Sequence, residues 1–149
     1  MAKPTTLPPL STKLLDADFR RADIEFLGVD HSGSSYEGRV YVNNPDADGA
    51  TPQTLDAGYA GSYHIFGHGG CLGDAGHCDV TPRRAYDPRP GHPLTGARKV
   101  VLASAALRGA LDGGEVSVTI VPIIRSVGPK SGWEDDIVQV DAVRIVTYR

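Results

Sequence analysis

Alternation of apolar and polar residues is the dominant pattern along this chain, and it predicts β-strands. The pattern is clearest over residues 115–122. Side chains of a strand point alternately to its two faces, so a period of two residues separates a buried set from an exposed set. We expect one face of this strand to carry Val116, Val118 and Ile120, and the other to carry Ser117, Thr119 and Val121.

Five more segments show a strand-like pattern. Residues 22–28 alternate between apolar and charged side chains, and residues 59–66 are aromatic and branched. The last segment changes phase near Asp141, which indicates a β-bulge. The further predicted strands are 22–28, 38–43, 59–66, 100–103 and 137–148.

Other segments follow different patterns. Residues 104–111 predict one or two helical turns, with Ser104 as the N-cap and Gly113 and Gly114 as the stop. Residues 1–18 are rich in Pro and Thr and predict an extended N-terminal arm. Six short strands and one short helix predict an all-β fold, an antiparallel β-sandwich of Greek-key or jelly-roll type. We expect a single domain over residues 19–149.

Composition narrows the classes of partner. A chain of 149 residues is the size of one domain, and its net charge of -3 provides no basic surface for nucleic acid. No apolar run is long enough for a membrane span, and no signal peptide is recognisable. We therefore expect no nucleic-acid or membrane partner. The compartment stays open between the cytoplasm and export together with a partner.

Metal-ligand chemistry is concentrated in residues 58–78, which hold three of the five histidines and both cysteines. Imidazole together with thiolate suits zinc or cuprous copper, although the spacing matches no standard zinc template. A disulfide between Cys71 and Cys78, or free thiols without a ligand, are the alternatives. His31 lies in a Ser/Gly turn and is expected to be solvated. The candidate metal ligands are His64, His68, Cys71, His77 and Cys78.

Motifs of the common catalytic sites do not occur in the sequence. There is no G-x-S-x-G nucleophile elbow and no phosphate-binding loop. The Asp-rich loop 44–49 does not have the glycine and glutamate spacing of an EF-hand, so it predicts an ordinary Asx turn. We expect this chain not to be an enzyme. A small metalloenzyme that uses His64, His68 and His77 is the weaker alternative.

Six segments of the chain follow one another in a recognisable order: 24–29, 38–43, 59–64, 102–111, 118–122 and 143–146. Taken in this order, they resemble the C-terminal β-sandwich domain of plant polyphenol oxidases and bacterial tyrosinase-like proteins. Each motif alone is weak, but their order over residues 19–148 is fairly specific. The loop that carries the cysteines and the Pro-rich segment 81–95 look like the bacterial variant.

This resemblance implies an accessory role without catalysis. In the family, oxidase chemistry belongs to a separate helical domain with two coppers and six histidines, and this chain has five histidines in all. The sandwich domain of the family covers the entrance to the copper site. The implied partner is a tyrosinase-like copper protein, contacted through Tyr63 and Phe66, and the His/Cys loop would bind or deliver copper. The alternative is a structural building block that forms a homo-oligomer through edge strands or the N-terminal arm.

Overall fold

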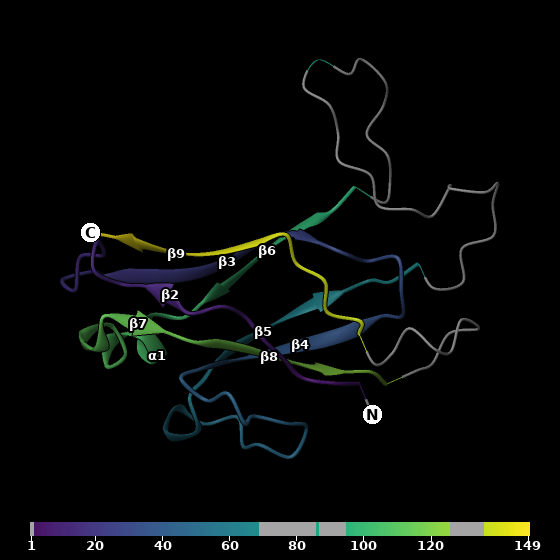
Figure 1. Ribbon diagram of the computed structural model, residues 1–149, viewed down its shortest axis with the longest axis horizontal. Helices are drawn as coiled ribbons and strands as arrows, with labels where there is room; N and C mark the ends of the chain where they lie inside the picture. The colour runs from purple at the N-terminus through teal and green to yellow at the C-terminus, as the bar shows by residue number, and fades with distance from the viewer. Residues whose placement is uncertain (1, 69–85, 87–94, 126–135) are drawn as a thin grey trace.

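The computed structural model describes residues 2–68, 86, 95–125 and 136–149 (Figure 1). Every pair of strands in this part of the chain is antiparallel. None of its helices is long and apolar enough to cross a membrane. The strands are β1 (Thr5–Thr6), β2 (Leu10–Ser11), β3 (Arg21–Val29), β4 (Tyr36–Val42), β5 (Tyr59–Ile65), β6 (Ala97–Leu102), β7 (Glu115–Val116), β8 (Val118–Ile123) and β9 (Ala142–Tyr148), and the helices are α1 (Ser104–Arg108) and the 3-10 turns η1 (Leu55–Ala57) and η2 (Leu111–Gly113).

Two sheets form the body of the fold. One has the strand order β1-β8-β4-β5 and the other β6-β3-β9, while β2 and β7 form a separate pair. Figure 1 shows β9 and β3 above β5, β4 and β8, with the helix α1 at one end. Each of the two sheets contributes one row of buried apolar side chains, and these two rows form the core between the sheets. The predicted all-β sandwich is confirmed.

The alternation over residues 115–122 is confirmed with one interruption. Val116, Val118 and Ile120 belong to the main core, whereas Val121 packs with Tyr41 in a smaller cluster on the other face. The ladder breaks at position 117, so the predicted single strand is two strands, β7 and β8. At this break the backbone N–H of Ser117 donates to the side-chain oxygen of Asn43 at 3.0 Å.

The N-terminal arm is extended, as predicted, and it lies along the sandwich. Its strand β1 pairs with β8 and its strand β2 pairs with β7. The hydroxyl of Thr12 donates to the carbonyl of Leu111 at 2.9 Å, in a buried position. The two short strands of the arm therefore pair with strands of the same chain.

Besides shifts of one to three residues at the ends of other strands, two predicted element boundaries are wrong. The helix α1 is shorter than 104–111, and Ser104 is its first residue rather than its cap; the Ser104 hydroxyl accepts a hydrogen bond from the Ala22 amide at 2.9 Å instead. The last strand begins at Ala142, because the preceding residues 137–140 run as irregular chain, with Ile137 and Val138 buried in the core. Tertiary contacts, which the alternation pattern does not contain, decide both boundaries.

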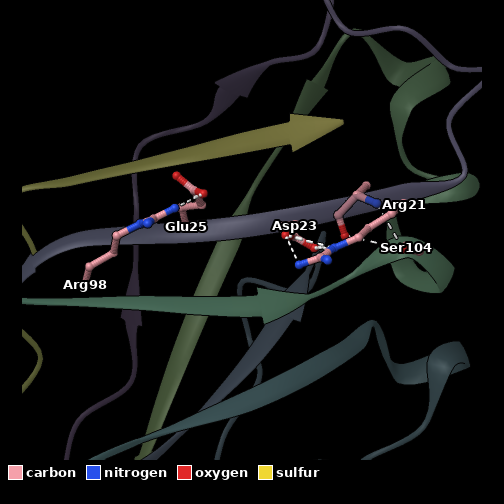
Figure 2. Close-up of polar contacts among 6 residues, drawn as sticks. Arg21, Asp23, Glu25, Arg98 and Ser104 are labelled. Atoms are coloured by element: carbon pink, nitrogen blue, oxygen red, sulfur yellow. Dashed lines mark hydrogen bonds and ion pairs between the residues drawn. The ribbon is translucent and has the colours of Figure 1, made fainter. Parts of the chain in front are cut away.

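The outer face of β3 carries two carboxylates that the alternation predicts to be exposed. Asp23 is 1% exposed and Glu25 is 2% exposed. Arg21 donates to Asp23 at 2.7 Å (Figure 2). Glu25 accepts hydrogen bonds from Arg144 at 2.6 Å and from Arg98 at 2.5 Å, and these bonds lower the pKa of its carboxyl. Three half-exposed guanidinium groups therefore cover two carboxylates on an otherwise open sheet face.

These ion pairs predict an acid-dependent loss of stability. A carboxyl whose pKa is lowered on folding contributes stability above its unfolded pKa, and that contribution disappears as pH falls through the folded pKa. Glu25→Gln should therefore lower stability at neutral pH and flatten the loss of stability below pH 4.5, the ordinary value for this carboxyl. Urea unfolding at a series of pH values measures both effects. Glu115→Gln, at an exposed position, is the matched control; equal flattening in both variants would contradict the assignment.

Candidate functional site

The hairpin of β4 and β5 brings together two segments that are distant in the sequence. Its register pairs Tyr36, the first residue of β4, with Ile65, the last residue of β5. The turn before β4 and the segment after β5 therefore lie side by side. Gly67 allows this close approach, because a Cβ at this position would collide with the carbonyl of Gly33. The Gly67 amide also donates to the hydroxyl of Ser35 at 3.0 Å.

Two half-buried histidines meet at this junction. The backbone N–H of His68 donates to the carbonyl of His31 at 2.9 Å. The Nδ1 atoms of the two imidazoles lie 3.1 Å apart, and the rings meet edge to face. The Nε2 of His31 lies 2.9 Å from the carbonyl oxygen of Thr95, just before β6. The pair therefore connects three chain segments at one end of the sandwich.

The hydrogen-bond partners assign a tautomer to each neutral ring. A carbonyl oxygen only accepts, so the Nε2 of His31 carries the proton and its Nδ1 keeps a lone pair. The Nδ1–H of His68 then donates to that lone pair, and it also lies 3.3 Å from the carbonyl of His31. This arrangement leaves a lone pair on the Nε2 of His68. The pair can therefore accept a proton or a metal ion at defined nitrogen atoms.

The predicted ligand set is divided between two places. His64 is exposed on β5, opposite Glu37 of β4, and lines a shallow pocket with Arg125. His68 contacts His31 instead, so the expectation that His31 is solvated is wrong. Among the described residues, no three His, Cys, Asp or Glu side chains are placed to hold a metal ion. Cys71, His77, Cys78 and the predicted Cys71–Cys78 disulfide lie outside those residues, and their roles stay predictions.

The two predicted partner contacts occupy opposite environments. Tyr63 is 4% exposed. Its ring is tilted against that of Phe26, with the centroids 5.1 Å apart, and it meets the ring of Tyr36 edge to face. Burial raises the pKa of Tyr36 to about 12 and raises that of Tyr63 further, so both phenols stay neutral in the core. Tyr63 is a core residue here and is not available to a partner. Phe66 is 82% exposed, with its ring centroid 6.2 Å from that of His68, and its contact role stays a prediction.

Sequence reasoning missed His31, although a signal for it exists. The spacing of 37 residues between His31 and His68 has no meaning by itself. An antiparallel pairing of the segments 38–43 and 59–66, extended beyond its end, places the turn 31–35 beside residues 67 and 68. The strand register would therefore have identified the pair.

Comparison with known proteins supports the fold. No family model and no curated protein matches the sequence. A recombinantly expressed latent aurone synthase, a polyphenol oxidase, matches with a TM-score of 0.56 at 15% identity over 99% of this chain and 25% of that chain. Latent aurone synthase from its natural source matches with a TM-score of 0.55 at 16% identity, over 98% and 24% of the two chains.

These matches concern a part of the larger enzyme. This chain spans about a quarter of the length of the polyphenol oxidase chains that it matches. At such low identity the likeness establishes the fold alone. The predicted resemblance to the sandwich domain of polyphenol oxidases is confirmed at that level.

Proposed function

We propose that this chain is a non-catalytic accessory module that binds a tyrosinase-like copper protein and shields its copper site. One observation carries the proposal: nearly the whole of this chain, but only a quarter of the polyphenol oxidase, enters the structural match. The matched enzyme is described as latent, which is consistent with a shielding segment in that protein. This proposal assigns the same shielding role to the sandwich described here.

The exposed end of β5 is the proposed contact surface. Phe66 follows β5 directly and is 82% exposed, an unusual position for a large aromatic side chain. Exposed aromatic residues often contribute much of the binding energy at protein interfaces. Phe66 also borders the His31–His68 pair, so a partner held there would lie close to these imidazoles. This proximity supports the finer proposal that the module binds or delivers copper.

Direct binding tests the accessory role. The metal-free chain is mixed with the copper-loaded catalytic domain of a latent polyphenol oxidase that was prepared without its own sandwich domain. EDTA in the buffer binds free metal ions only. We expect a 1:1 complex by light scattering and a slower oxidation of a diphenol substrate. Phe66→Ala should weaken the complex about tenfold, which corresponds to about 1.4 kcal/mol. Leu14→Ala, at a side chain that is 99% exposed, is the matched control. No complex at about 100 μM of each protein would contradict the proposal.

A structural building block is the second candidate, and the strand order favours it. Within the described residues, β6 and β9 are the edges of the three-stranded sheet. Leu102 on β6 is 63% exposed and Tyr148 on β9 is 43% exposed. Exposed edge strands with apolar side chains can pair with other copies of the chain. In this case sedimentation equilibrium would show a homo-oligomer of fixed mass, and Leu102→Lys would dissociate it.

A further inference from the structure

We propose that His31 and His68 form a chelating pair that binds one Cu²⁺ ion through their two Nδ1 atoms. The proposal deepens the copper-binding part of the proposed function and rests on it for the expectation that copper is delivered to a partner. It replaces His64 with His31 in the ligand set. Within the described residues, the imidazoles of His31 and His68 are in direct contact with each other.

The separation of the two nitrogens matches a shared metal ion. Metal–imidazole bonds are about 2.0–2.1 Å long, so two nitrogens on one metal lie about 2.9 Å apart at a right angle and about 3.4 Å apart at a tetrahedral angle. The Nδ1 atoms of His31 and His68 are 3.1 Å apart, inside this range. In the metal-free pair the same distance is bridged by a hydrogen bond. A metal ion bound by both atoms would lie about 1.3 Å off the line between them, so each ring would turn by about 40° to aim its lone pair at the ion.

The hydrogen bond from His31 to Thr95 supports a ligand role. A metal-binding histidine almost always donates its second ring N–H to a carbonyl or carboxylate, which fixes the tautomer and strengthens the ligand. The Nε2–H of His31 donates to the carbonyl of Thr95 at 2.9 Å and so aims the Nδ1 lone pair at His68. For His68, binding exchanges tautomers: Nδ1 releases its proton to water and Nε2 takes one up. The charge of the ring is unchanged.

Hydrogen bonds hold the two backbone segments that carry the rings in place before a metal arrives. The amide of His68 donates to the carbonyl of His31, and the amide of Gly67 donates to the hydroxyl of Ser35. The turn itself is held by a 2.8 Å hydrogen bond from the Ser32 amide to the carboxylate of Asp30. Ligands held in position lose little conformational freedom on binding, which raises affinity.

The chemistry of the pair favours copper. Imidazole nitrogen suits copper, zinc and nickel, and a given nitrogen site generally binds Cu²⁺ most tightly among these ions. Two imidazoles fill only part of the coordination shell of Cu²⁺. Water or a side chain of a partner would fill the remaining positions, as the transfer of the ion requires.

A copper titration in a chain without thiols tests the inference. Cys71→Ser and Cys78→Ser are introduced together, and Cu²⁺ is titrated against a competing chelator. We expect one Cu²⁺ per chain and nitrogen hyperfine structure in its electron paramagnetic resonance spectrum. His31→Phe and His68→Phe should each lower the affinity for Cu²⁺ at least about 10- to 100-fold. Removal of a residue that only hydrogen-bonds to a metal ligand already causes a loss of this size. His64→Phe is the matched control and should retain the affinity.

A second measurement needs no variant of the pair. In the thiol-free chain, substoichiometric Cu²⁺ should broaden the imidazole nitrogen resonances of His31 and His68 before those of His64. Loss of tight binding on removal of the cysteines alone, or equal broadening of all three histidines, would overturn the inference. Neither result affects the binding experiment with the catalytic domain, because that experiment uses the metal-free chain. Failure of the copper site and failure of the accessory role are therefore distinguishable.

Discussion

Truncation of Phe26 to alanine is expected to lower the free energy of unfolding by about 3–5 kcal/mol, the usual range for a buried Phe. Phe26 lies near the middle of β3, is fully buried, and contacts the ring of Tyr63 from the facing sheet with the centroids 5.1 Å apart. Removal of the ring leaves a cavity between two sheets whose strands are held by their own ladders, so the site cannot fully collapse. Urea unfolding followed by far-ultraviolet circular dichroism measures the loss.

The chain offers a matched control for this substitution. Phe66→Ala removes the same group from a side chain that is 82% exposed, so we expect a change within about 0.5 kcal/mol. The two variants differ in burial and not in chemistry. A loss of similar size in both would mean that Phe66 is also part of a packed core, and it would remove Phe66 from the proposed contact surface.

Gly58→Ala is the second substitution with a large expected effect, a loss of at least about 2 kcal/mol. Gly58 joins η1 to β5 with a φ of 82°, a left-handed conformation that costs a residue with a Cβ about 1–2 kcal/mol. A Cβ at Gly58 would also collide with the carbonyl oxygen of Val42, and this atom belongs to the backbone of β4 and cannot rotate away. The hydrogen bond of 2.8 Å from the Val42 amide to the Gly58 carbonyl would be strained as well.

Gly109→Ala is the control for this prediction. Gly109 follows α1 with a right-handed helical conformation, and a Cβ there would meet no atom within 4 Å. Alanine restricts the unfolded chain more than glycine does, so we expect a gain of about 0.4–1 kcal/mol. Both variants are measured by urea unfolding. Equal effects of the two substitutions would show that the close approach of Gly58 to β4 has no energetic consequence.

The candidate site shows where sequence reasoning ends. The sequence identifies the histidines and their chemistry, and it includes His68 among the candidate metal ligands. It pairs His68 with His64, four residues away, because only spacing along the chain is available. Four residues of extended strand span about 13 Å, and the chain does not turn back to bring His64 to His68. The partner that the fold provides is His31, 37 residues away.

Local patterns alone determined the class of fold and the positions of most strands. The alternation around Ile24 and Ile120 predicts which side chains of each strand are buried, and each residue of the strand contributes to this pattern. The same alternation placed Glu25 on the solvent face, where a sequence pattern expects exposure.

Tertiary structure decided the remaining features, because they depend on contacts between distant segments. Glu25 is buried because Arg98 of β6 and Arg144 of β9 extend over it from the neighbouring strands. His31 meets His68 because the register of β4 and β5 aligns the ends of two strands. Hydrophobic patterning specifies which face of a strand is buried, but the pairing of strands specifies which side chains become neighbours, and this pairing arises only when the whole sandwich assembles.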